Sequence, residues 1–289
     1  MNPSQGTVTP IGIEVRIDRA TVLPGRVWCA ERPRALVGIV HGLGEHSGRY
    51  AALASDLVAR ARCTVVALDL PGHGDASGAR GDVPSWTMLR EQVVPAMFTA
   101  TRGLPDSPGE LPHVLMGHSM GGVLALDAAL AHPRAYHGLV LSAPALRSVM
   151  PPWWKLALAN VARATAPGTG FPHGLDLTGL SRDAEVLKLY EQDPRVHGKI
   201  SPRLYFEFGE ARQRCLRGAR SLAVPTLLLQ GMADRVVDPR GSLEMAAAAA
   251  EKIVRCVTLP EGYHETFNDL GRDAALLELV AWLDVVLVV

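Results

Sequence analysis

The chain has 289 residues, of which 48% are hydrophobic, and its 29 basic and 29 acidic residues cancel to a formal net charge of zero. This length and apolar content fit one large α/β domain with an insertion. The balanced charge, without a run of basic residues, offers nothing to attract nucleic acid or an anionic membrane surface.

Residues 1–10 carry neither the positive n-region nor the apolar h-region of a secretory signal. The cysteines are widely spaced and match no zinc-binding pattern; they are Cys29, Cys63, Cys215 and Cys256. We therefore expect these residues to be small core or surface thiols in a reducing compartment, which indicates a cytoplasmic protein. We expect neither a metal nor a cofactor. The apolar segment 274–289 is interrupted by Glu278 and Asp284, which favours a core-packing helix over a membrane span.

Apolar runs alternate between the strand pattern and the helical pattern along most of the chain. In chain order, the expected elements are strands at 11–16, 26–30 and 36–40, a helix at 50–60, a strand at 63–70, a helix at 85–102, a strand ending before Ser119, a helix from 123 to about 131, strands at 138–142 and 225–230, a helix at 243–251 and a strand at 253–259. The first two strands are expected as an antiparallel edge. The alternation predicts a mostly parallel sheet covered by helices on both faces.

This alternation stops between residues 147 and 205, where proline, glycine and large apolar residues mix. Such a long connection is either a functional lid or a disordered insert. Trp153, Trp154 and helical stretches at 155–163 and 183–190 favour an ordered apolar cap, and an insert that merely packs on the core is the alternative. The predicted organisation is a core of residues 1–146 and 206–289 with a cap, or lid, insertion at 147–205.

One short motif, Gly117, Ser119 and Gly121, has the G-x-S-x-G spacing of a nucleophile elbow. It falls where an apolar run ends and a helical apolar pattern begins at Val123. The serine of such an elbow takes a strained backbone conformation, and glycines two residues on either side remove the Cβ atoms that would clash. The turn lifts the hydroxyl clear of the sheet and aims the first N–H groups of the helix at the reaction centre.

A serine nucleophile needs an imidazole base, which is itself oriented by a carboxylate. In sheets that carry this elbow, the three follow in the order serine, acid, histidine on loops after strands. Of the histidines beyond Ser119, His264 alone follows a late strand, and we assign it as the base. The acid is Asp234 or Asp238. Asp238 precedes Pro239 and suits a helix N-cap, whereas Asp234 has no such local duty and is the better candidate.

Negative charge on the substrate oxygen requires N–H donors that form an oxyanion hole. The backbone N–H of Met120 is one candidate. The second is expected in the loop His41-Gly42-Leu43-Gly44, whose glycines allow close backbone approach, and we select the N–H of Leu43. His41 and His73 are interpreted as turn-stabilising residues rather than as extra catalytic histidines.

Several segments together resemble the monoacylglycerol lipase family of α/β hydrolases, over most of the chain and including the cap. They are residues 41–50 (HGLGEHSGRY), 71–74 (PGHG) with Arg80-Gly81, 117–122 (GHSMGG), Ser181-Arg182-Asp183 followed by Tyr190 and Asp193-Pro194, and Tyr263-His264-Glu265. The combination is far more specific than G-x-S-x-G alone.

This resemblance implies an α/β-hydrolase fold, with a mostly parallel central sheet flanked by helices and a helical cap insertion. It also implies a serine hydrolase that releases fatty acid and glycerol from monoacylglycerol, with an acyl tunnel under a mobile cap. By the same resemblance, Arg49 and Tyr190 match positions near the polar end that handles the glycerol.

Two other functions stay open: a general carboxylesterase or lysophospholipase acting on single-chain esters, and a non-catalytic binding protein of the same fold. The intact trio Ser119, Asp234 and His264 argues against the latter. Trp153 and Trp154 suit a surface that is wet at one end and apolar at the other, so we expect them to bind substrate. The expected partners are a small lipid ester and, through the cap, a transient peripheral contact with a lipid surface.

Overall fold

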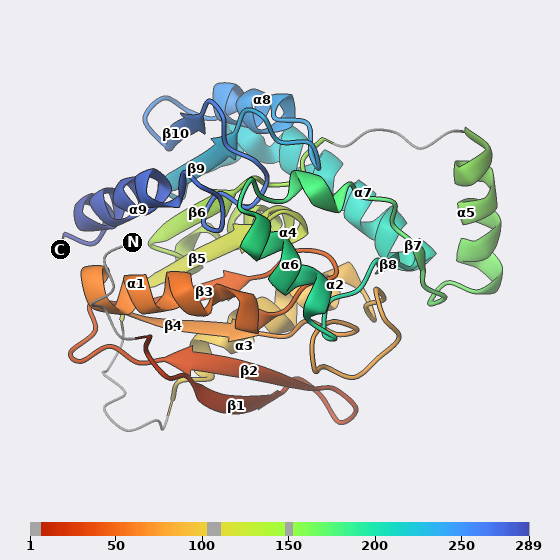
Figure 1. Ribbon diagram of the computed structural model, residues 1–289, viewed down its shortest axis with the longest axis horizontal. Coiled ribbons are helices and arrows are strands. Elements are labelled where there is room, and N and C mark those ends of the chain that lie inside the picture. Colours follow the sequence, from red (N-terminus) through yellow and green to blue (C-terminus); the bar gives the residue numbers. More distant parts are fainter. Residues whose placement is uncertain (1–6, 103–110, 148–152, 289) are drawn as a thin grey trace.

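The computed structural model describes residues 7–102, 111–147 and 153–288. Within them, eight strands form one sheet in the order β1-β2-β4-β3-β5-β6-β9-β10 (Figure 1). The strands are β1 (Ile11–Arg16), β2 (Val22–Trp28), β3 (Ala35–Val40), β4 (Cys63–Leu68), β5 (His113–His118), β6 (Gly138–Ser142), β9 (Thr226–Gly231) and β10 (Val254–Leu259). β2 pairs antiparallel with β1 and β4, and the other neighbours pair in parallel. The antiparallel edge and the mostly parallel sheet are confirmed.

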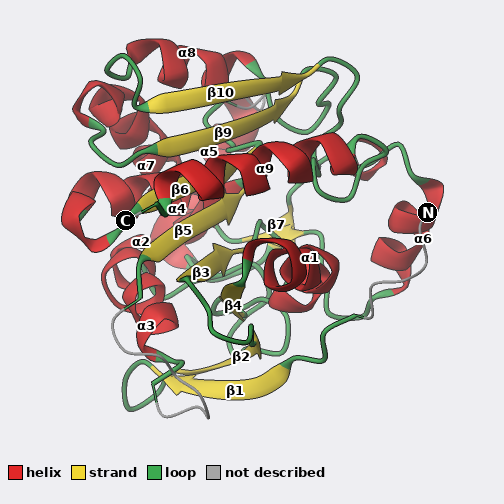
Figure 2. Cartoon of the chain, turned by 90° about the vertical axis from the view of Figure 1, so that its left-hand side faces the viewer, coloured by secondary structure: helices red, strands yellow, loops and turns green. Residues whose placement is uncertain are grey.

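Helices cover both faces of this sheet, so every residue of β3, β4, β6 and β9 is buried. Two helices, α1 (Ala51–Ala61) and α9 (Arg272–Val286), lie together on one face (Figure 2). The other face carries α2 (Trp86–Met88), α3 (Val94–Thr99), α4 (Met120–Ala131), α7 (Pro202–Gly218) and α8 (Arg240–Ala248). The buried Leu276, Leu279 and Trp282 of α9 confirm that this apolar segment packs on the core.

Several predicted boundaries differ from the structure; α4, for example, begins at Met120 and not at residue 123. β2 begins at Val22, because the carbonyl of Pro24 still accepts the N–H of Asp69 at 2.8 Å and the proline does not interrupt the pairing. α8 begins at Arg240, three residues earlier than expected. The helix expected at 85–102 contains a π-helical turn at Leu89–Val93 directly before α3, where Pro95 has no N–H to complete an α-helical ladder.

Helix α7 is absent from the predicted elements, and it crosses the expected domain boundary between residues 205 and 206. The hydroxyl of Ser201 accepts the N–H of Leu204 at 3.0 Å, and Pro202 takes the first helical position, so these residues start the helix. The buried Ala211 and Cys215 pack in the same core as α4. The boundary therefore falls inside a helix that belongs to the core.

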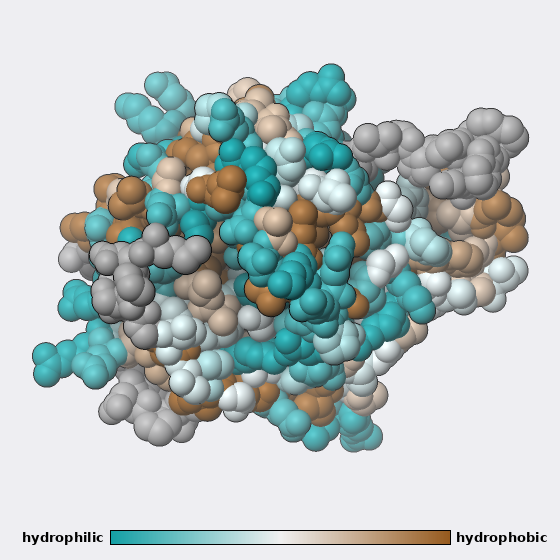
Figure 3. All heavy atoms as spheres, in the orientation of Figure 1, coloured by the Kyte–Doolittle hydropathy of each residue, from teal (hydrophilic) through white to brown (hydrophobic). Residues whose placement is uncertain are grey.

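The segment predicted as a cap, residues 147–205 and called the cap below, contains α5 (Trp153–Thr165), the short strands β7 (Phe171–Pro172) and β8 (Lys199–Ile200), and α6 (Ala184–Gln192). α5 stands apart from the body in Figure 1 and touches α7, where Arg163 lies 3.4 Å from Glu210. Leu158 and Val161 of α5 are each 63% exposed, and Figure 3 shows apolar side chains gathered there.

Among the described helices, none combines the length and the hydrophobicity needed to cross a membrane. Two of the cysteines, Cys63 and Cys215, are buried, and the other two are exposed. None of the four, all of which lie in the described part of the chain, forms a disulfide.

Candidate active site

Ser119 lies at the predicted elbow between β5 and α4, with φ 54° and ψ −118°. A positive φ is strained for a residue that carries a Cβ. A Cβ on Gly117 would collide with the carbonyl oxygen of Gly121, and a Cβ on Gly121 would collide with that of Val40. Both glycines are therefore needed for the close approach of strand, turn and helix. The N–H of Ser119 donates to the carbonyl of Ser142 at 3.0 Å, which fixes the turn on β6.

His264, which follows β10, meets Asp234, which follows β9. Its Nδ1 lies 2.7 Å from Asp234 Oδ2, and both residues are buried. The other carboxylate oxygen, Oδ1, accepts the N–H groups of Val236 and Val237 at 2.8 and 2.9 Å. Asp234 caps no helix, as expected, but its side chain also organises the turn that follows β9.

The surroundings keep Asp234 ionised. Burial alone would raise the pKa of this carboxyl, but His264 and the two backbone N–H groups outweigh burial and lower the pKa below its ordinary value. An ionised Asp234 accepts the Nδ1–H of His264, which leaves Nε2 as the basic nitrogen. That tautomer can take a proton from a serine hydroxyl.

The alternative acid, Asp238, binds Arg240 instead. Its carboxylate accepts the backbone N–H of Arg240 at 3.0 Å and pairs with the guanidinium at 2.7 Å. Pro239 is the residue directly before α8, so Asp238 stabilises the helix start from one position further back than expected.

Ser119 and His264 line one small cavity between the core and the cap. Its volume is about 30 Å³, which leaves room for one or two water molecules. The core contributes Gly42, Leu43, Glu45, Arg49, His118 and Glu265, and the cap contributes His173, Leu175, Leu177, Leu180 and Tyr190.

One oxyanion-hole candidate follows Ser119 directly in the chain, and the other lines the same cavity as Ser119. Leu43 lines the cavity in the loop after β3, and a Cβ on the preceding Gly42 would lie only 3.2 Å from the Cβ of Ser119. The N–H of Gly42 donates to Glu45 Oε1 at 2.5 Å, which holds this loop in place. Met120 is the first residue of α4 and directly follows the serine.

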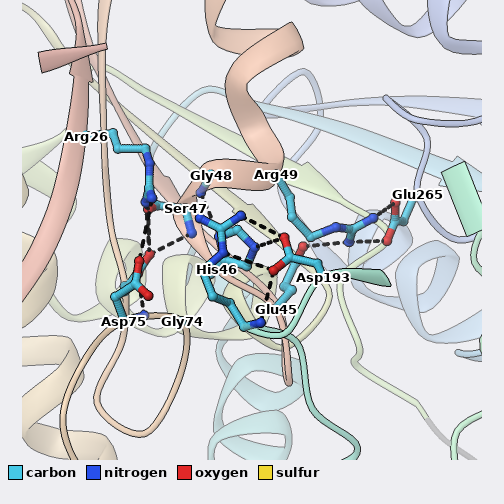
Figure 4. Close-up of polar contacts among 12 residues, drawn as sticks. Arg26, Glu45, His46, Ser47, Gly48, Arg49, Gly74, Asp75, Asp193 and Glu265 are labelled. Carbon is cyan, nitrogen blue, oxygen red and sulfur yellow. Dashed lines mark hydrogen bonds and ion pairs between the residues drawn. The ribbon is translucent and has the colours of Figure 1, made fainter. Parts of the chain in front are cut away.

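Arg49 lies between two carboxylates at the polar end of the cavity (Figure 4). Its guanidinium nitrogens lie 2.5 and 2.8 Å from the two oxygens of Glu265 and 3.0 Å from Glu45 Oε2. The guanidinium carbon lies 4.6 Å from the centre of the Tyr190 ring. The structure thus brings Arg49 and Tyr190 together. Sequence reasoning assigned no role to Glu45 or Glu265, although both stand within motifs that carry the resemblance.

Comparisons with known proteins identify the family of this chain. The serine aminopeptidase S33 family of hydrolases matches residues 31–271. A monoacylglycerol lipase of Mycolicibacterium smegmatis is 32% identical over 262 residues, which cover 89% of this chain and 91% of that protein. The crystal structure of Paleococcus ferrophilus monoacylglycerol lipase has a TM-score of 0.82 and 33% identity, covering 91% of this chain and 99% of that one. The chain belongs to the monoacylglycerol lipase family.

Membership of the monoacylglycerol lipase family confirms the α/β-hydrolase fold and makes the chain a carboxylic ester hydrolase. The chain is also similar to another lipid hydrolase. Phospholipase YtpA of Bacillus subtilis is 29% identical to it over 261 residues, which cover 89% of this chain and 98% of that protein.

In this member of the monoacylglycerol lipase family, the predicted cap segment is hydrogen-bonded to residues 260–271, called the base loop below because they carry the predicted base His264. The N–H of Glu265 donates to the carbonyl of Leu180 at 2.8 Å. Asp269 accepts the N–H and the guanidinium of Arg182 at 2.7 and 2.9 Å. The base loop therefore takes part of its shape from the cap.

His41 and His73 stabilise turns, as predicted. His41 Nε2 accepts the N–H of Leu70 at 2.9 Å, and His73 Nδ1 lies 2.9 Å from the carbonyl oxygen of Pro71. The other two predicted substrate contacts, Trp153 and Trp154, begin α5, but their side chains lie outside the described residues.

Proposed function

We propose that the protein hydrolyses monoacylglycerols to fatty acid and glycerol, with Ser119, Asp234 and His264 as its catalytic triad. One observation carries the proposal: His264 Nδ1 and Asp234 Oδ2 form a buried pair at 2.7 Å, beside a cavity that His264 shares with the strained Ser119. The relatives named as monoacylglycerol lipases support the substrate class.

In this reaction Ser119 Oγ attacks the ester carbonyl carbon while His264 Nε2 takes the hydroxyl proton, and Asp234 stabilises the resulting imidazolium. The N–H groups of Leu43 and Met120 bind the oxyanion. When the intermediate collapses, His264 gives its proton to the ester oxygen, and glycerol leaves. Water then attacks the acyl-enzyme with the same base, and the fatty acid is released.

The glycerol lies at the polar end of the cavity, beside Arg49 and Tyr190. The acyl chain extends toward a larger cavity of about 380 Å³ between α5 and α7. Two observations support this direction, because together they connect Ser119 to the larger cavity. The N–H of Ala145 donates to the carbonyl of Ser119 at 3.0 Å, and the next residue, Leu146, lines the larger cavity. Further apolar lining comes from Leu156, Phe206 and Leu216.

The cap comprises residues 147–201, since α7 belongs to the core. A cavity of about 30 Å³ does not hold the substrate, so the cap has to open. The α5 segment, with Trp153 and Trp154 at its start and the exposed Leu158 and Val161, contacts the lipid surface transiently during this step.

Ser119→Ala tests the proposal. It should lower kcat by on the order of 10⁶, because the triad acts as a unit. The melting temperature should not fall. A fluorophosphonate should label the wild type at Ser119 alone, and Ser221→Ala, at an exposed serine, serves as the matched control. Labelling of another residue, or substantial activity in Ser119→Ala, refutes the assignment.

Hydrolysis of lysophospholipids is a second candidate function, favoured by the similarity to phospholipase YtpA. Measuring kcat/KM on monoacylglycerols, lysophospholipids and p-nitrophenyl esters separates the two. We expect the highest value on a monoacylglycerol.

A further inference from the structure

The position of the base fixes where the head group of the substrate lies. His264 has to protonate the departing alcohol oxygen, so the alcohol half of the ester lies beside this residue. The next residue, Glu265, lines the same cavity with Glu45, Arg49 and Tyr190. The charge of these side chains therefore acts directly on the head group.

Two carboxylates and one guanidinium meet at this end of the cavity (Figure 4). Arg49 makes two short bonds with Glu265 and one bond of 3.0 Å with Glu45, and the three side chains are between 4% and 11% exposed. The ring of Tyr190 stacks on the guanidinium at 4.6 Å. The single positive charge of the cluster, on Arg49, is thus paired with the two negative charges of Glu45 and Glu265. The formal net charge of the cluster is −1.

The other titratable groups of the cavity do not reverse this sign. Burial lowers the pKa of His118 and of His173, so both rings are neutral at pH 7. Asp234, which is bonded to His264, balances the imidazolium that forms on His264 during the reaction. Among the described residues that line the cavity, Arg49 is the single arginine or lysine.

We propose that Glu45, Arg49 and Glu265 form a head-group filter, which admits neutral alcohols such as glycerol and rejects a phosphate. The filter rests on the proposed function, since it acts on the leaving group of the same ester. A phosphate would enter a buried site of net negative charge and find its cation already paired, whereas glycerol hydroxyls can donate hydrogen bonds to carboxylate oxygens. The filter favours monoacylglycerols over lysophospholipids that carry an anionic head group.

Glu265→Gln tests the filter, because it removes one negative charge and keeps an amide oxygen for Arg49. The assay compares kcat/KM for 1-oleoylglycerol and 1-oleoyl-lysophosphatidic acid in micelles of a neutral detergent. We expect the wild type to prefer the glycerol ester by about 100-fold, and Glu265→Gln to narrow this ratio by about tenfold, equal to about 1.4 kcal/mol. The matched control is Glu278→Gln, which removes a surface carboxylate paired with Arg255 and should leave the ratio unchanged.

A second measurement uses the wild type alone. It tests the head-group filter even if thermal unfolding shows that the variant Glu265→Gln does not fold. Free glycerol should inhibit hydrolysis of p-nitrophenyl butyrate more strongly than glycerol 3-phosphate does. Equal inhibition by the two compounds, or an unchanged substrate ratio in folded Glu265→Gln, overturns the filter. A wild type that cleaves both oleoyl esters with equal kcat/KM also overturns it and leaves the proposed esterase intact. A wild type that cleaves no ester overturns both proposals.

Discussion

Replacing Asp234 by asparagine tests the site most sharply, because the variant keeps the shape of the side chain and exchanges one oxygen for an NH₂ group. In the wild type, Oδ1 accepts two backbone N–H groups at 2.8 and 2.9 Å, and Oδ2 accepts His264 Nδ1 at 2.7 Å. An amide has a single oxygen for these donors. Turning its NH₂ toward Val236 and Val237 would leave two buried N–H groups unpaired, at about 1–3 kcal/mol each. The amide oxygen therefore stays on the backbone, and the NH₂ group faces His264.

That orientation fixes the wrong tautomer. His264 Nδ1 becomes the acceptor, the ring proton moves to Nε2, and the ring no longer accepts the proton of Ser119. We expect kcat to fall by about 10³–10⁴, equal to about 4–5.5 kcal/mol in the barrier. The melting temperature should change by only a few degrees, since both backbone hydrogen bonds persist.

The assay is the hydrolysis of p-nitrophenyl butyrate, with Asp238→Asn as the matched control. Asp238 meets Arg240 and the start of α8, and asparagine also caps helices well, so this variant should retain most of its activity. A loss of about 10³ in Asp238→Asn, with near-normal kcat in Asp234→Asn, would show that the wrong carboxylate has been assigned.

Two further predictions concern the acid range and the lipid surface. Burial alone would raise the pKa of Glu45, but Arg49 and two neighbouring histidines lower it to about 2 from 4.5. The ionised carboxyl then stabilises the fold above pH 4.5, and this contribution is lost as the pH falls toward 2. Between pH 6 and pH 2 the wild type should lose up to about 3 kcal/mol more unfolding free energy than Glu45→Gln in urea titrations, and equal losses contradict the reasoning. The double variant Leu158→Ser, Val161→Ser should lower kcat/KM at least about tenfold on micellar monoacylglycerol and leave p-nitrophenyl acetate hydrolysis unchanged, because each side chain contributes about 1.5–3 kcal/mol when buried. Equal losses on both substrates would instead indicate a structural role.

The parts of the fold that the sequence predicts correctly depend on local signals. The buried strands are continuous apolar runs, and the elbow is a strand, a G-x-S-x-G turn and a helix, all within residues 113–131. His264 is selected by its order along the chain after a late strand. The signal for α7 is also local: Leu204, Phe208, Ala211 and Cys215 follow helical spacing, although the charged residues among them hide it.

The parts that the sequence does not predict depend on contacts between distant residues. Arg49 and Glu265 are separated by 216 positions, and no local pattern indicates that their side chains form a buried ion pair. For Asp234, the contact is local, but the sequence pattern is too common to predict it. Its hydrogen bonds to Val236 and Val237 are local, but an aspartate two residues before a valine is too common to predict such a turn.

The contacts between cap and core argue against a cap that is a separate module. The base loop depends on the carbonyl of Leu180 and on Arg182, both in the cap, and His46 Nε2 of the core lies 2.9 Å from Asp193 Oδ2 at the end of α6 (Figure 4). Deleting the cap would therefore remove partners of the base loop as well as the roof of the cavity. The backbone of the cap, and not only its apolar side chains, is part of what holds His264 beside Asp234.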